Sequence, residues 1–87
     1  MPKFKKSTRK NNKYMVDYAG TWIHFGNKNY PQYRDSTGLG LYSHLDHGDK
    51  KRRKSYLARA KGIKNKNGNL TWNNPQYANY YSVKYLW

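Results

Sequence analysis

Aromatic side chains have to supply most of the hydrophobic core of this protein. The 87 residues include ten Tyr, three Trp and two Phe, and a ring of this kind can bury roughly 150–250 Å². The charge of the chain opposes compaction. The sequence has 18 Lys and Arg but only four Asp and no Glu, so the formal net charge is +14 and the cations repel one another. A charge this high is typical of disordered chains, whereas this aromatic content is not. We therefore predict one small domain with a thin, tyrosine-rich core that is marginally stable without a partner.

The clearest strand signal is residues 14–25, "YMVDYAGTWIHF". Apolar and polar side chains alternate on both sides of Ala19-Gly20, and Gly20 tolerates the positive φ of a tight turn. The pattern predicts an N-terminal β-hairpin. Residues 26–45 contain Gly and Pro at short intervals and are predicted to be a long ordered loop. Asn67-Gly68 predicts a second turn within residues 62–74.

Two helices are predicted to pack with this hairpin. Residues 46–61 form the basic central helix, with Asp46 as its N-terminal cap and Gly62 after its last turn. Residues 75–87, "PQYANYYSVKYLW", form a short aromatic C-terminal helix that begins at Pro75. The predicted fold class is therefore α+β, as a small single domain. The side chains expected in its core are Trp22, Phe25, Tyr42, Tyr56, Val83 and Trp87.

The N-terminal residues are predicted to lie outside this domain. Residues 1–13 hold six cations and one aromatic side chain, a composition typical of an arm that becomes ordered only against an acidic partner. The predicted organisation is a basic arm over residues 1–13 and an α+β domain over residues 14–87.

The cations are concentrated in two segments, since nine others lie within residues 50–66. Such density favours binding to phosphates or to acidic protein surfaces, and no set of base-reading side chains stands out. The candidate binding residues are Lys50, Lys51, Arg52, Arg53, Lys54 and Arg59 in the central helix, Lys61, Lys64 and Lys66 beyond it, and Lys3, Lys5, Lys6, Arg9 and Lys10 in the arm.

The stretch from Phe25 to Arg59 carries a family resemblance. Its motifs, in order, are Phe25-Gly26, Tyr33 with Asp35 and Thr37, Tyr42-Ser43-His44, His47 with Asp49, Arg52-Arg53, Tyr56 and Arg59, and the chain ends "YYSVKYLW". This order resembles a family of small basic proteins of unknown function encoded by large nucleocytoplasmic DNA viruses of algae and protists. The resemblance implies a viral origin and a compact α+β unit, and no established activity. The helix of that family tends to end Arg-His, whereas Ala60 follows Arg59 here.

A metal site is the alternative interpretation of the segment before the central helix. His44, Asp46 and His47 are of ligand types that suit zinc, manganese or iron, and a histidine beside a metal is the core of small metal-dependent nucleases. Five consecutive cations follow, which disfavours binding of a metal cation. The simpler interpretation is that the Asp residues cap the helix and His47 packs locally. Because no nucleophile with an orienting base is evident, we expect neither enzymatic activity nor a cofactor.

The sequence favours a non-enzymatic structural protein of a virion, either a minor capsid protein or a capsid-lining component. Its expected partners are viral capsid proteins with acidic surfaces, and packaged DNA through non-specific phosphate contacts. The alternative is a sequence-independent nucleic-acid-binding protein of viral replication or packaging, located in the viral factory or the nucleus, and a metal-dependent nuclease ranks third. No apolar run is long enough to predict a membrane span.

Overall fold

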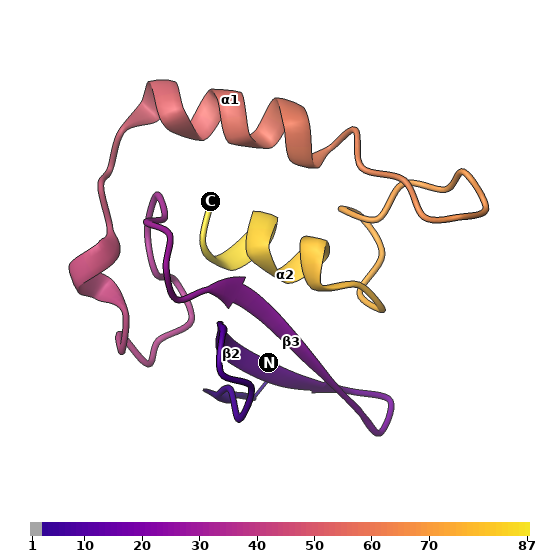
Figure 1. The fold of residues 1–87 in the computed structure, drawn as a ribbon, viewed down its shortest axis with the longest axis horizontal. Helices are drawn as coiled ribbons and strands as arrows, with labels where there is room; N and C mark the ends of the chain where they lie inside the picture. Colours follow the sequence, from indigo (N-terminus) through magenta and orange to yellow (C-terminus); the bar gives the residue numbers. More distant parts are fainter. Residues whose placement is uncertain (1–2) are drawn as a thin grey trace.

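The fold, a computed structural model, is described for residues 3–87. Within these residues, three antiparallel strands form one sheet in the order β1-β2-β3, accompanied by two α-helices. The elements are β1 (Phe4–Lys6), β2 (Asn12–Tyr18), β3 (Thr21–Asn27), the 3₁₀ turn η1 (Ser43–Leu45), α1 (Lys50–Ala60) and α2 (Ala78–Tyr85). Helix α2 lies between the sheet and α1 (Figure 1). The predicted α+β single domain is confirmed.

Strands β2 and β3 form the predicted hairpin. Both Ala19 (φ 51°) and Gly20 (φ 82°) adopt positive φ, which is the backbone geometry of the tight turns that match the twist of a hairpin. The Asp17 carboxylate accepts a hydrogen bond from the Gly20 N–H at 3.0 Å and closes the turn. In the register, Tyr14 lies opposite Phe25 and Val16 lies opposite Ile23.

One face of the hairpin and α2 enclose the core. Its buried members are Tyr14, Val16, Ile23, Phe25, Tyr81 and Leu86. The prediction for Phe25 is confirmed, since it is fully buried. The prediction for Trp22 is wrong: it is 41% exposed because it pairs with Asp17 on the opposite face of the sheet from Phe25. The other four expected core side chains, Tyr42, Tyr56, Val83 and Trp87, are half-buried.

The predicted N-terminal arm is largely part of the domain. Residues Phe4–Lys6 form β1, which pairs with β2 and places Phe4 opposite Val16. The Phe4 ring packs edge-on against Phe25 and Tyr85, with centroid separations of 5.7 and 4.6 Å. The predicted boundary at residue 13 therefore falls inside β2, because one aromatic side chain ties the basic segment to the core. The start of that arm, residues 1 and 2, lies outside the described residues.

Both helices are shorter than predicted. Helix α1 begins after Asp49, whose carboxylate accepts hydrogen bonds from the N–H groups of Lys51 (2.9 Å) and Arg52 (3.3 Å). Asp46 is not the cap, because Gly48 adopts φ 62° and keeps the preceding residues out of the helix. Helix α2 begins at Ala78, three residues after Pro75. Across residues 3–87 no helix is long and apolar enough to span a membrane.

A polar network orders the long loop between β3 and α1. Gln32 is fully buried, and its amide donates to the Asp46 carboxylate (2.7 Å) and to the Tyr42 carbonyl (2.9 Å). The Lys13 ammonium donates to the Gln32 side-chain oxygen from the β2 side, and the Asp35 N–H donates to Asp46 at 3.0 Å. The Asp46 carboxylate is thereby committed to folding the loop.

Candidate polyanion-binding surface

The sequence of α1 distributes its cations around the helix. Tyr56 and Ala60, four residues apart, lie on the face toward α2, where Ala60 is buried and the Tyr56 ring stacks on Trp87 at 4.1 Å between centroids. Asn79 of α2 donates to the Ala60 carbonyl at 2.8 Å and closes this contact. The cations occupy the remaining circumference, and every Lys and Arg of the helix is exposed.

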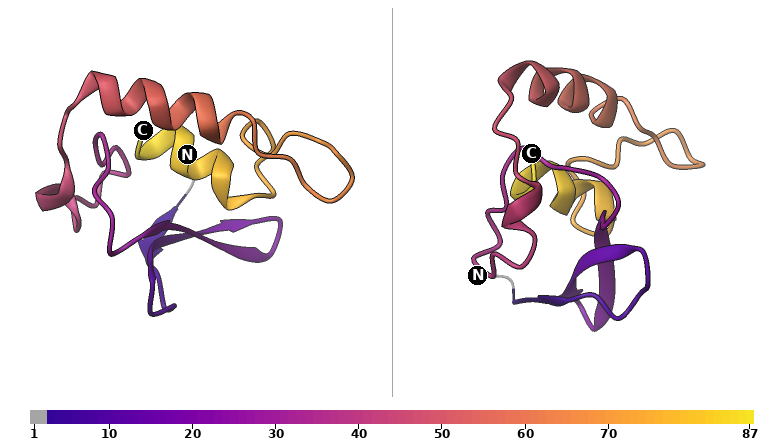
Figure 2. Two further views of the ribbon diagram at one scale, coloured as in Figure 1. Left: turned by 45° about the horizontal axis from the view of Figure 1, so that its top comes forward. Right: turned by 60° about the vertical axis from the view of Figure 1, so that its left-hand side comes forward.

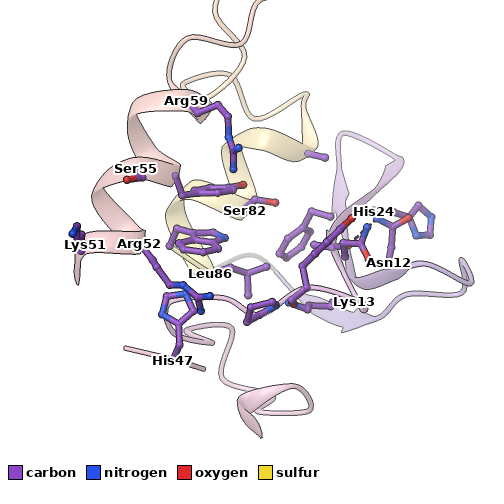
Figure 3. A pocket seen from close by; sticks show the side chains of 18 residues that line it. Asn12, Lys13, His24, His47, Lys51, Arg52, Ser55, Arg59, Ser82 and Leu86 are labelled. Carbon is purple, nitrogen blue, oxygen red and sulfur yellow. Dashed lines mark hydrogen bonds between the residues drawn. The ribbon is translucent and has the colours of Figure 1, made fainter. Parts of the chain in front are cut away.

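Helix α1 carries three exposed lysines, Lys50, Lys51 and Lys54. Lys51 also lines the cavity described below, in which Figure 3 labels it. We call these three residues the outer lysines. Lys61, Lys64 and Lys66 are also exposed and continue the charge along the segment after the helix.

Arg53 differs from these because it takes part in the fold. Its Nε donates to the Trp87 carbonyl oxygen at 2.6 Å, and its guanidinium lies 5.2 Å from the centre of the Tyr33 ring. Lys61 makes a similar contact with Trp72 at 5.0 Å. The sequence-based prediction assigned Arg53 to partner binding, whereas its contacts are those of a residue that holds α1 to the loop and to the end of the chain.

The cations of the N-terminal segment form a separate surface. Lys3, Lys5, Lys6, Arg9 and Lys10 are exposed and lie on or beside β1 and β2, on the far side of α2 from α1 (Figures 1 and 2). Lys5 lies over the exposed Trp22 ring at 5.2 Å. The structure therefore does not combine the two predicted cationic sets into one surface.

All four carboxylate side chains of the protein accept hydrogen bonds from the fold itself. Asp17 closes the hairpin turn and Asp49 caps α1. Asp46 accepts from Gln32, and Asp35 accepts from the Tyr14 hydroxyl and from Thr37. Each carboxylate is therefore engaged by the fold and does not neutralise the surface of α1. The cations on that surface are available to an external anion.

Burial and hydrogen bonding shift several pKa values around the loop network. Burial lowers the pKa of Lys13 to about 8, although the charges of Asp35 and Asp46 act in the opposite direction. Burial, together with the hydrogen bond to Asp35, raises the pKa of Tyr14 to about 12. Burial also opposes ionisation of Asp35, but hydrogen bonds from Thr37 and Tyr14 outweigh it and hold its pKa below the usual range.

The histidines and acids before α1 do not assemble a metal centre. Within residues 3–87 no three His or Asp side chains lie close enough together to hold a metal ion. His44 is exposed, and Asp46 is occupied by Gln32 and the Asp35 N–H. The His47 ring packs near Trp87 and Tyr33, with centroid separations of 5.2 and 6.2 Å.

A serine–histidine contact escaped the sequence-based prediction. The hydroxyl of Ser7 lies 2.6 Å from Nδ1 of His24, and burial, followed by the nearby Arg9 charge, lowers the pKa of that histidine. Ser7 is only 7% exposed, and its hydroxyl oxygen accepts the Arg9 N–H. These contacts tie the turn after β1 to β3, and a side chain so buried is poorly placed to attack a substrate.

A cavity of about 990 Å³ lies between α1, α2 and the ends of β2 and β3. Arg52 and Arg59 extend from α1 toward it, and Ser82 and Leu86 of α2 lie across from them (Figure 3). Lys13 and His24 contribute from the sheet. The cavity depends on tertiary packing, but the spacing of Arg52, Tyr56 and Arg59 along one side of a helix is visible in the sequence.

Residues 2–37 match a family that is described only as a family of unknown function (DUF5754). The matched region contains the three-stranded sheet and the beginning of the long loop, and it ends before α1. Neither a curated protein nor a solved structure shows significant similarity to the chain. The match therefore adds no information about the cationic helix.

Proposed function

We propose that this protein is a non-enzymatic nucleic-acid-binding protein that contacts phosphates through α1 and the segment after it. The observation that carries the proposal is the exposure of the outer lysines, with Lys61, Lys64 and Lys66 beyond them, in a chain whose four carboxylates are committed to the fold. Such a surface binds a polyanion by releasing condensed counterions. The contact is independent of base sequence, because lysine ammonium groups meet phosphates as point charges.

The proposal predicts a steep salt dependence. If about six of these lysines contact phosphates, the logarithm of the association constant for duplex DNA falls with the logarithm of salt concentration at a slope of about −5. Fluorescence anisotropy with a labelled duplex of about 20 base pairs, from about 50 to 300 mM salt, measures that slope. Replacing the three outer lysines, Lys50, Lys51 and Lys54, by Gln is expected to reduce the slope by about 3.

The matched control removes the same charge from the other surface. The variant with Lys5, Lys6 and Lys10 replaced by Gln has the same net charge as the outer-lysine variant, and it is expected to retain most of the slope. Equal losses in both variants would show that net charge, rather than the surface of α1, governs binding. Duplex affinity that is negligible at about 50 mM salt would overturn the proposal itself.

A second candidate function is the minor capsid or capsid-lining role expected from the sequence. The supporting observation is apolar exposure in the long loop, where Leu39 is 43% exposed and Leu41 is 49% exposed. Phosphate binding does not need such side chains, whereas protein–protein contacts do. In this proposal the chain lines a viral capsid and also meets the packaged DNA. Mass spectrometry of purified virions is expected to find it in many copies, and its absence from particles would exclude this role.

A further inference from the structure

The cavity between α1, α2 and the hairpin combines cationic and aromatic groups. The guanidinium groups of Arg52 and Arg59 reach it from α1, and the Lys13 side chain reaches it from β2. None of the described residues that line it is an Asp. Its volume of about 990 Å³ is at the upper end of what small-ligand sites enclose. An anion that also carries a planar ring fits this chemistry better than a simple ion does.

His47 supplies a hydrogen-bond donor that has no partner among residues 3–87. Its Nδ1 accepts the Asp49 N–H at 2.9 Å, so the proton of the neutral ring is on Nε2. That Nε2 is buried and finds no hydrogen-bond partner within the described residues. The ring lines the cavity beside the Arg52 side chain (Figure 3). An unsatisfied buried donor destabilises the fold, and an anionic oxygen placed between His47 and Arg52 would satisfy it.

Tyr30 supplies a free aromatic face at the edge of the same cavity. Its side chain is 64% exposed, the highest value among the large hydrophobic side chains that are exposed. Its backbone is held at both ends, because its carbonyl accepts from the Lys13 ammonium at 2.9 Å and its N–H donates to the Asn27 carbonyl at 3.2 Å. The backbone that carries the ring is therefore held in place, and the exposed ring is accessible for stacking on an unpaired base.

The spacing of the two arginines indicates more than one phosphate. Arg52 and Arg59 are seven residues apart in α1, which corresponds to about 10 Å along the helix axis. Different phosphates of one strand match that separation better than a single phosphate. We propose that the cavity binds a short single-stranded segment of nucleic acid, with phosphates at Arg52, His47 and Arg59 and one base stacked on Tyr30.

This inference rests on the proposed nucleic-acid binding and assigns the single-stranded part of it to the cavity side of α1, where Arg52 and Arg59 lie and Lys51 also contributes. A base inside a duplex is paired and stacked, so it cannot reach Tyr30 without being extruded. The outer lysines contact duplex and single strands alike, whereas the cavity distinguishes between them.

The test compares oligo(dT) of about 12 nucleotides with a duplex of the same length, by fluorescence anisotropy at one salt concentration. The variant Tyr30→Ala is expected to weaken oligo(dT) binding about 5- to 150-fold and to leave duplex binding unchanged. The double variant Arg52→Gln with Arg59→Gln is expected to lose more affinity for oligo(dT) than for the duplex. The control, Lys50→Gln with Lys54→Gln, removes the same charge from the outer face and is expected to weaken both ligands equally.

The outcomes separate this inference from the proposed function. Wild-type protein that binds neither ligand would overturn both. Duplex binding by the wild type, with oligo(dT) affinity unchanged in Tyr30→Ala, would overturn the single-strand site and leave the proposed function intact. Equal weakening of both ligands in Tyr30→Ala would also overturn it, because the ring would then serve general binding. Circular dichroism verifies the fold of each variant. Tyr30→Ala is expected to disturb the fold least, because the Tyr30 side chain is exposed.

Discussion

Lys13 is expected to make the free energy of unfolding of this protein rise with pH between its lowered pKa of about 8 and the ordinary lysine value of 10.5. The side chain is 1% exposed, and its ammonium donates to the Tyr30 carbonyl and the Gln32 side-chain oxygen. Burial lowers its pKa from 10.5 to about 8. Between these two values the unfolded chain holds more protons than the folded chain, so the free energy of unfolding increases as pH increases.

The size of the effect follows from the two pKa values. At about pH 7 both states are protonated and the cost of the buried charge is fully present. By about pH 9.5 the folded state has lost the proton while the unfolded state retains it, and the free energy of unfolding is expected to rise by about 2 kcal/mol. Urea denaturation followed by tryptophan fluorescence, at about pH 7, 8 and 9.5, measures this increase.

The variant Lys13→Met provides the control. Other effects of pH, including the falling net charge, act on both proteins, so only the difference between them reports Lys13. The wild type is expected to gain about 2 kcal/mol more than the variant over this range. Parallel pH profiles would refute the reasoning, because they would show that the buried ammonium titrates like an exposed one.

Three test substitutions, two of them with a control variant, examine how the fold is held together. Gly26→Ala places a Cβ 2.9 Å from Leu86 Cδ1 at φ 75° and is expected to lower the free energy of unfolding by about 2–5 kcal/mol. The control Gly20→Ala, at φ 82° with open space around it, should lower it by only about 1–2 kcal/mol. Urea denaturation compares the two variants, and equal losses would contradict the packing argument. Asp49→Ala removes the cap of α1 and is expected to cost about 1 kcal/mol, with a smaller helical signal in circular dichroism; an unchanged signal and stability would show that the cap is dispensable. Arg53→Gln removes the contacts with Trp87 and Tyr33 and is expected to lower the free energy of unfolding by about 1–2 kcal/mol in thermal or urea unfolding. The control Lys54→Gln should remain within about 0.5 kcal/mol of the wild type. Similar values for both variants would mean that Arg53 is only a surface charge.

The hairpin and both helices were predictable because their signals are local. Alternation of side chains around Ala19-Gly20 specifies the hairpin without knowledge of the rest of the chain. The start of α1 was harder to place, because Asp46 and Asp49 are both good caps in the sequence. Gly48 and the pairing of Asp46 with Gln32 decide between them, and that pairing involves residues 14 positions apart.

Strand β1 could not be predicted because its three residues, Phe4–Lys6, carry no alternating pattern of their own. They form a strand because β2 offers an edge and Phe4 reaches the core, which are both non-local effects. The same holds for Lys13, whose charge in the sequence is typical of an exposed residue. Its burial depends on oxygen atoms that the loop around Gln32 brings to it.

The cationic site was predictable only in part. The density of Lys and Arg in residues 50–66 identified the segment, and helical spacing separates its inner and outer sides. The sequence could not show that Arg53 stabilises the fold while the neighbouring lysines of α1 make no such contacts within residues 3–87. Its contacts are with Tyr33 and Trp87, which are distant in the sequence. The cavity beside Arg52 and Arg59 likewise needs the sheet as its second wall.

The location of bound nucleic acid on the protein is the most direct test of the central claim. Titration of isotope-labelled protein with a short duplex, followed by amide chemical shifts in two-dimensional NMR spectra, identifies the residues in contact. The account predicts that the largest shifts occur in α1 and in residues 61–66, with small shifts in β1. Large shifts confined to β1 and the β2–β3 turn, or to the loop around Leu39 and Leu41, would contradict it.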